Sequence, residues 1–411
     1  MKRLVVFLLA VALAFAAAPP ARRRVVKKAV PVRISPAARQ AARDEIDKRI
    51  AALSTGVENP AALESFYSAL DQALNGGPPV HILQFGDSHT ASDDWVNTMR
   101  TAFQARFGEG GPGFVHAGRP FRGYRRFDAA GTQSLGWKTE GVMALRGDQH
   151  QGLSGLSITA QTSGQTVSLK ATGELLEIFY QQQPGGGDFA IEIDGEAAAT
   201  IETEGETAPG IYSRAMQAGP HQVVLRTTQR APVRLFGYTL DNTRGVTFEM
   251  LGINGAQANV ITGWNGPEWS TFATRRNPSL VILAYGTNEA NSHLWTAEQY
   301  RADLTAVIAR VRATAPDASI LLVGPPDCGN LKPLVHLDDV VAIQRELSTK
   351  QNLAFWDWQL HMGGSRIVRR WVTAGLSQGD YIHLTAEGYR RIGEMLAGQL
   401  LNGFSTHEQT R

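Results

Sequence analysis

The sequence predicts an α/β fold with a parallel sheet, into which an all-β unit is inserted. Two apolar runs, residues 280–285 and 320–323, are continuous, which is typical of strands buried on both faces. A helical pattern over residues 297–314 lies between them, and this alternation favours a parallel sheet with helices on both faces. Residues from about 140 to 240 instead form short alternating patterns separated by glycine-rich turns, which indicates a β-sandwich or jelly roll.

The N-terminus has the pattern of a secretory signal peptide. Met1-Lys2-Arg3 is followed by the apolar stretch from Leu4 to Ala18, which ends in alanine-rich sites that suit a signal peptidase. A membrane anchor is the alternative, but a run of this length is short for a bilayer span. We therefore expect a signal peptide over residues 1–18, and no stable membrane insertion after its removal.

Charge is distributed unevenly along the chain. The first 43 residues contain ten of the 40 Lys and Arg residues and none of the 38 acidic ones. Together with its prolines, this composition predicts a basic, flexible linker over residues 19–44. The rest of the chain has more acids than bases, so nucleic acid is not an expected partner.

Two helices are expected before the first strand. Ser35-Pro36 is typical of a helix start, with the serine as N-cap and the proline in the first turn. Asn59-Pro60 begins a second helical pattern, which stops at Gly76-Gly77. The apolar run at residues 80–85 then provides the first strand.

Ser88 follows that strand at a predicted strand-to-helix turn. Gly86-Asp87-Ser88 closes the strand, and a helical pattern covers residues 91–107. A serine at such a turn can hold its hydroxyl clear of the sheet, with N–H groups of the helix start nearby. Acyl transfer needs an exposed nucleophile and donors for a developing oxyanion, although Gly-Asp-Ser is also common in ordinary turns.

Further polar residues are expected close to this serine. Asp380 and His383 lie three residues apart before the last helical pattern, so both can meet one serine from a single loop. Asn288, like Ser88, follows a predicted strand. Because ligands of parallel sheets sit at the carboxyl ends of the strands, we expect Ser88 and Asn288 to meet at one edge.

At these residues the chain resembles the SGNH (GDSL-type) hydrolases. Four blocks match in order: Gly86-Asp87-Ser88, Gly252-Ile253-Asn254-Gly255, Gly286-Thr287-Asn288-Glu289 and Asp380-x-x-His383. The third block has Thr-Asn-Glu where the family usually shows Asn-Asp, but its asparagine is retained. The resemblance implies a three-layer, flavodoxin-like SGNH hydrolase fold. The form Gly-Asp-Ser-His-Thr, the signal peptide and the long insert are most similar to peptidoglycan O-acetylesterases of Gram-negative bacteria.

The resemblance, with the chemistry of the residue types, implies a role for each residue. Ser88 is the expected nucleophile, His383 its general base and Asp380 the acid that orients the base. The expected oxyanion donors are the Ser88 and Gly255 N–H groups and the Asn288 amide, with glycine at 255 leaving space for the acyl group. Gly86 and Asp87 are expected to support the turn. His89 is expected to point away from the serine in a structural or solvent-facing role.

The domain organisation follows from these blocks. We assign a discontinuous catalytic domain to residues 45–139 and 241–411, and the inserted β-sandwich to residues 140–240. The insert resembles the carbohydrate-binding-module-like inserts of the same esterases, and a structural lid without affinity for sugar is equally compatible with its pattern.

No cofactor or metal is expected, because no spacing of His, Cys, Asp and Glu matches a metal site. Cys328 is the only cysteine, so an intramolecular disulfide is excluded. Nothing in the sequence indicates an oligomeric state.

The expected protein is a secreted, periplasmic serine esterase that removes O-acetyl groups from an envelope glycan, with peptidoglycan as the expected substrate. Two alternatives remain open at this point. The same residues would serve a glycan O-acetyltransferase, in which a sugar hydroxyl replaces water. A glycan-binding envelope protein with vestigial catalytic blocks is the other, although four intact blocks argue against it.

Overall fold

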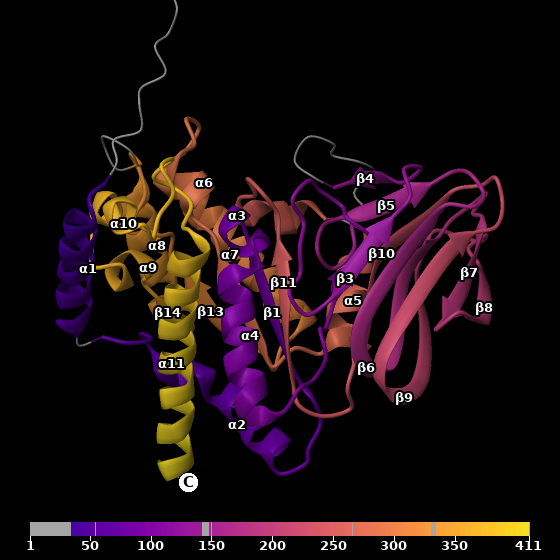
Figure 1. The fold of residues 1–411 in the computed structure, drawn as a ribbon, viewed down its shortest axis with the longest axis horizontal. Coiled ribbons are helices and arrows are strands. Elements are labelled where there is room, and N and C mark those ends of the chain that lie inside the picture. Colours follow the sequence, from indigo (N-terminus) through magenta and orange to yellow (C-terminus); the bar gives the residue numbers. More distant parts are fainter. Residues whose placement is uncertain are drawn as a thin grey trace, which may run out of the picture. The chain divides into compact units, whose positions relative to one another are not determined.

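Five parallel strands form the central sheet of the part of the chain that the computed structural model describes (Figure 1). They are β1 (Val80–Gly86), β11 (Val246–Gly252), β12 (Leu280–Ala284), β13 (Ser319–Val323) and β14 (Ala354–Trp356). Their order in the sheet is β11-β1-β12-β13-β14, and every neighbouring pair is parallel. All residues of β12 and β13 are buried, which confirms the interpretation of the continuous apolar runs. The strand order is that of a flavodoxin-like doubly wound sheet.

The structure describes residues 34–53, 55–141, 148, 150–264, 266–329 and 334–410. The expected signal peptide and the linker up to residue 33 lie outside this range. The first helix begins at Pro36, as predicted from Ser35-Pro36. The linker expected over residues 19–44 therefore overlaps this helix, and its C-terminal boundary was placed too late. No described helix combines the length and the apolar character that crossing a membrane would require.

Helices cover both faces of the sheet. Alternate residues of each strand point to opposite sides, so a strand that is apolar throughout has a hydrophobic surface on each face to be covered. Ile82 and Ile282 belong to one core, and Leu83 and Leu283 to the other. The first core is covered by α1 (Pro36–Ala51), α2 (Glu64–Leu74), α4 (Asp94–Phe107), α10 (Val368–Ala374) and α11 (Ala386–Thr410). The second is covered by α5 (Pro267–Arg276), α7 (Ala297–Thr314) and α8 (Leu337–Lys350). Short helical turns complete the described elements: η1 (Pro60–Leu63), α3 (Ser88–Ala91), η2 (Ala258–Gly263), α6 (Thr287–Ala290) and α9 (Trp358–His361).

An antiparallel sheet of nine described strands forms the β-rich part of the chain. The strands are β2 (Val115–His116), β3 (Ala130–Gln133), β4 (Lys138–Glu140), β5 (Ser157–Ala160), β6 (Thr166–Gln182), β7 (Asp188–Ile193), β8 (Glu196–Glu202), β9 (Ala208–Thr227) and β10 (Val233–Asp241). A β-sandwich or jelly roll of short strands was predicted; the all-β character is confirmed, but the described strands belong to one sheet and two of them are far longer than expected. The ladder between β6 and β9 continues across an irregularity at Gly173, so their 17 and 20 residues form uninterrupted strands.

The β-rich part begins before residue 140 and shares a core with the α/β part. β2 pairs with β10, and β3 pairs with β6, so the boundary placed at residue 140 cuts through the sheet. Phe272 of α5 packs against Phe179 and Phe236 of the antiparallel sheet, with ring centroids 5.0 and 5.3 Å apart. Residues 36–411 accordingly form one compact unit. Strand periodicity could not reveal this, because it identifies strands but not the surfaces against which they pack.

Candidate active site

The turn after β1 positions Ser88. The Asp87 side chain caps α3, accepting a hydrogen bond from the His89 N–H at 2.9 Å. Ser88 is the first residue of that helix, immediately beyond the carboxyl end of the strand. Gly86 is required here because a Cβ at this position would lie 2.1 Å from Thr90 Oγ1. The turn therefore depends on both residues that were predicted to support it.

The structure brings together the serine, the histidine and the aspartate named from the sequence. Ser88 Oγ lies 2.9 Å from His383 Nε2, and His383 Nδ1 lies 2.8 Å from Asp380 Oδ2. The other oxygen of Asp380 accepts the N–H groups of Ile382 and His383, each at 3.0 Å. These three bonds fix the carboxylate in the loop before α11.

The electrostatics of the loop keep Asp380 ionised. Partial burial acts to raise the pKa of Asp380, but the hydrogen bonds from His383 and from two backbone N–H groups outweigh it and lower that pKa below its ordinary value. An ionised acid at Nδ1 holds the proton on that nitrogen, which leaves Nε2 free to accept the serine proton. The arrangement can therefore support nucleophilic attack by Ser88 Oγ.

The predicted oxyanion donors lie at the same edge of the sheet. Asn288 is on α6, directly after β12, and its amide nitrogen donates to the Ala256 carbonyl at 2.9 Å and lies 3.5 Å from Asp87 Oδ2. Gly255 has φ of +77°, and a Cβ there would meet no atom of the described residues within 4 Å. Glycine at 255 is thus required by its left-handed backbone, and the space beside it is open.

Replacing Asn288 by alanine should lower kcat by about 10²–10³-fold, the typical cost of removing one oxyanion donor. The substitution also removes the hydrogen bond from the Asn288 amide to the Ala256 carbonyl, which holds the loop that carries Gly255. Steady-state kinetics on a soluble acetyl ester would measure the effect, with KM nearly unchanged because the amide binds the charged oxygen most strongly. Asn291→Ala, at an exposed asparagine one turn later, is the matched control. A rise in KM with unchanged kcat would instead place Asn288 in ground-state binding.

His89 does not point into solvent. It is 2% exposed, its Nδ1 lies 2.8 Å from the Tyr389 hydroxyl, and its ring centroid is 5.4 Å from that of His383. Burial lowers the pKa of His89 to about 3, so the ring is neutral and adds no charge beside His383. The expected structural role of His89 is confirmed, and the solvent-facing alternative is wrong because Tyr389, on the last helix, provides a buried partner.

A pocket of about 380 Å³ opens over the serine. Ser88, His383 and Asn254 line it together with Phe121 and Arg125. The last two were not identified from the sequence, because the loop that carries them has neither a periodic pattern nor a recognisable motif. The pocket is thus built from the α/β sheet edge on one side and a loop preceding β3 on another.

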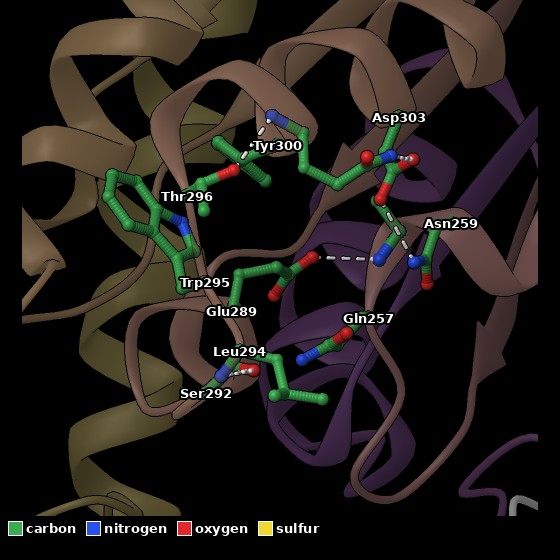
Figure 2. A pocket seen from close by; sticks show the side chains of 11 residues that line it. Gln257, Asn259, Glu289, Ser292, Leu294, Trp295, Thr296, Tyr300 and Asp303 are labelled. Atoms are coloured by element: carbon green, nitrogen blue, oxygen red, sulfur yellow. Dashed lines mark hydrogen bonds between the residues drawn. The ribbon is translucent and has the colours of Figure 1, made fainter.

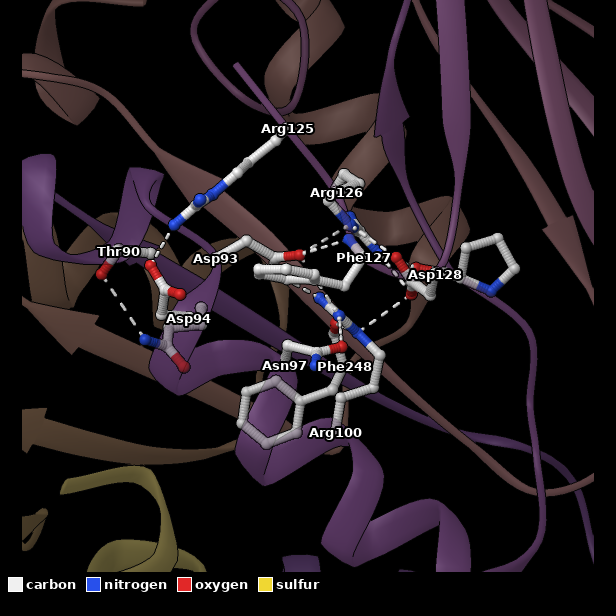
Figure 3. Close-up of polar contacts among 12 residues, drawn as sticks. Thr90, Asp93, Asp94, Asn97, Arg100, Arg125, Arg126, Phe127, Asp128 and Phe248 are labelled. Atoms are coloured by element: carbon white, nitrogen blue, oxygen red, sulfur yellow. Dashed lines mark hydrogen bonds and ion pairs between the residues drawn. The ribbon is translucent and has the colours of Figure 1, made fainter. Parts of the chain in front are cut away.

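Buried ion pairs hold that loop against α4 (Figure 3). Arg100 of α4 is 1% exposed and bonds Asp93 at 2.8 Å and Asp128 at 3.0 Å. Arg126 donates to Asp128 at 2.8 Å, and nearer the pocket Arg125 pairs with Asp94. Burial alone would raise the pKa of Asp128, but Arg126 and Arg100 hold it below its ordinary value.

Arg100→Met should destabilise the fold by about 3–5 kcal/mol, because it leaves the fully buried Asp93 without its closest cation. Urea unfolding would measure the change. Arg122→Met, at an exposed position of the same loop, should stay within about 0.5 kcal/mol of the wild type. Similar stability of both variants would mean that the network does not anchor the loop.

Comparisons with known proteins agree with this arrangement. The GDSL-like Lipase/Acylhydrolase family model matches residues 207–391, a stretch that includes Gly255, Asn288, Asp380 and His383. No curated protein matches the sequence.

Among solved structures, one described as a peptidoglycan O-acetylesterase in action is similar over most of the chain. It shares 25% identity, the match covers 83% of this chain and 96% of that one, and the TM-score is 0.72. A family two carbohydrate esterase from Clostridium thermocellum in complex with cellohexaose aligns with 14% identity, over 71% of this chain and 98% of that one, at a TM-score of 0.32. The likeness in fold therefore rests on the first structure.

Proposed function

We propose that this chain, which is a carboxylic ester hydrolase of the SGNH (GDSL) type, removes O-acetyl groups from peptidoglycan in the periplasm. The observation that carries the proposal is the hydrogen-bonded chain from Ser88 through His383 to Asp380, at the carboxyl edge of the parallel sheet. The proposed substrate and the O-acetyl linkage come from the likeness to a peptidoglycan O-acetylesterase structure. The periplasmic location comes from the signal-peptide pattern at residues 1–18.

The reaction would proceed in two halves. Ser88 Oγ attacks the acetyl carbonyl while His383 Nε2 takes its proton, and the oxyanion is held by the Ser88 and Gly255 N–H groups and the Asn288 amide. When the C–O bond to the sugar breaks, His383 returns the proton to the leaving sugar oxygen. Water then attacks the acetyl-Ser88 ester with His383 again as base, and acetate and free serine are formed.

The pocket over Ser88 suits an ester carried on a large molecule. It is open, and polar and aromatic side chains line it together, with Gln378 and Arg125 beside Phe121. A small acetyl group can reach the serine while the polymer remains outside. The loop between β2 and β3 provides one wall of this cleft through Phe121, Gly123 and Arg125.

Acetate release tests the substrate. Purified O-acetylated peptidoglycan and acetylated xylan are offered to the wild type at equal acetyl content, with Ser88→Ala as the blank for spontaneous hydrolysis. Release from peptidoglycan is expected to be the faster by at least about tenfold. Faster release from xylan would overturn the peptidoglycan assignment while leaving the esterase intact. Acetyl transfer to an added glycan, in place of acetate release, would identify a transferase.

A further inference from the structure

A second pocket lies beside the oxyanion loop (Figure 2). It has a volume of about 240 Å³, and Gln257 and Ala258 form one wall, two and three residues after Gly255. The opposite wall comes from residues 289–303, which begin one residue after Asn288. Its size is below the usual range of about 300–1,000 Å³ for small-molecule sites, so it fits one compact group, such as part of a single sugar unit.

Glu289 projects into the middle of this pocket, as Figure 2 shows. The side chain is on a residue only 5% exposed, and its Oε1 accepts the Ala258 N–H at 2.7 Å. Its Oε2 has no hydrogen-bond partner among the residues that the structure describes. Burial raises the pKa of Glu289 to about 7, so above neutral pH this oxygen is an unsatisfied acceptor.

Trp295 supplies a matching donor in the same pocket. Its indole Nε1 is buried, and within the described part of the chain it too lacks a partner. The ring is stacked on His336, with centroids 4.2 Å apart and planes 14° from parallel. Stacking fixes the plane of the indole, so the direction of its N–H is set before any ligand arrives.

Several other polar side chains of the pocket already have hydrogen-bond partners. Asp303 accepts from Asn259 at 3.1 Å and from Gln299 at 2.7 Å, and Gln257 donates to the Asn288 carbonyl at 3.2 Å. The described lining contains no Lys, Arg or His. Among the described lining residues, Glu289 Oε2 and Trp295 Nε1 are the two buried polar atoms without a partner, and the apolar side chain of Leu294 also lines the pocket.

We propose that this pocket binds the acetamido group of an N-acetylated sugar unit in the glycan. The amide N–H donates to Glu289 Oε2, and the amide carbonyl accepts from Trp295 Nε1. An acetamido group is a compact group that offers a donor, an acceptor and a methyl, so it would satisfy both of these buried atoms. The proposal deepens the proposed function, because it places a neighbouring sugar unit beside the oxyanion loop.

Ligand titration of the full-length Ser88→Ala protein tests this at pH 8, where Glu289 is largely ionised. The three probes are N-acetylglucosamine, glucosamine and glucose. The binding of each sugar is monitored by saturation-transfer NMR. N-acetylglucosamine should bind at least about tenfold more tightly than glucose, with the strongest transfer to its acetyl methyl. Equal binding of these two sugars would overturn the proposal, and so would preference for glucosamine, which would indicate an ammonium site.

Two variants probe the two atoms separately. Trp295→Phe keeps an aromatic ring but removes the N–H, and Glu289→Gln keeps an oxygen for the Ala258 N–H but replaces the acceptor with a donor. Each substitution should raise the Kd for N-acetylglucosamine about five- to tenfold, the effect expected for the loss of one hydrogen bond. Glu298→Gln, at an exposed acid outside the pocket, should bind as the parent does. Parent-like binding by both pocket variants would overturn the assignment.

Failure of this proposal can be told apart from failure of the proposed function. Binding of the free sugar does not require hydrolysis, whereas acetate release from peptidoglycan is measured on the protein with Ser88 intact. Sugar binding without acetate release would support the acetamido subsite and reject peptidoglycan as the substrate. Acetate release without selective sugar binding would reject the subsite alone.

Discussion

Replacing Ser88 by alanine is expected to abolish hydrolysis of acetyl esters, with a loss in kcat on the order of 10⁶-fold. The Oγ that lies 2.9 Å from His383 Nε2 is the atom that would bond to the acyl group, and among the described residues no other hydroxyl bonds this nitrogen. Initial rates on a soluble chromogenic acetyl ester measure the effect, and mass spectrometry of the wild type during turnover should detect acetyl-Ser88.

The fold should survive this change, because Ser88 is partly exposed and its hydroxyl fills no core space. Unfolding curves of the variant and the wild type should agree to within about 0.5 kcal/mol. Ser270→Ala, at an exposed serine of α5, is the matched control and should keep full activity. Near-normal turnover by Ser88→Ala would refute the assignment of the nucleophile.

His383→Ala should be nearly as damaging as the loss of the serine, and Asp380→Asn should reduce kcat by about 10⁴-fold. The asparagine keeps its size but can present an amide to His383 Nδ1, which would place the proton on the wrong ring nitrogen. Because the two residues act as one unit, the double variant should be little worse than His383→Ala alone. Rates of the four proteins on one soluble ester give this comparison.

Multiplying losses in the double variant would show instead that the two residues act independently. His293→Ala, an exposed histidine in the loop after α6, controls for removal of an imidazole. Asp380 also accepts two backbone N–H groups, so Asp380→Asn should lower stability slightly through the weaker acceptor. Comparing unfolding curves separates that effect from the loss of catalysis.

The loop from Phe121 to Asp128 links stability to the shape of the active site. Arg125 lines the pocket over Ser88, and the next residue, Arg126, belongs to the buried network with Arg100 and Asp128. The catalytic cleft therefore depends on charges that take no part in the chemistry. A loss of this network should change access to the serine before it changes the hydrogen bonds of Ser88 itself.

Local chemistry explains what could be read from the sequence alone. Continuous apolar runs identify strands buried on both faces, so β12 and β13 were predicted with nearly their observed limits. The turn at Ser88 and the pair Asp380 and His383 depend on residues close together in the chain, and their types define the chemistry. Parallel strands then bring these blocks to one edge, since the carboxyl ends of the strands share it.

Only the tertiary structure decided the features that depend on packing between distant segments. His89 is buried because Tyr389, 300 residues later, bonds its ring, and the antiparallel sheet begins before residue 140 because β2 and β3 pair with strands far along the chain. Likewise, Glu289 lies in a pocket because Trp295 and Ala258 surround it. Periodicity records which side of an element is buried, but not the partner that buries it, so these contacts left no pattern in the sequence.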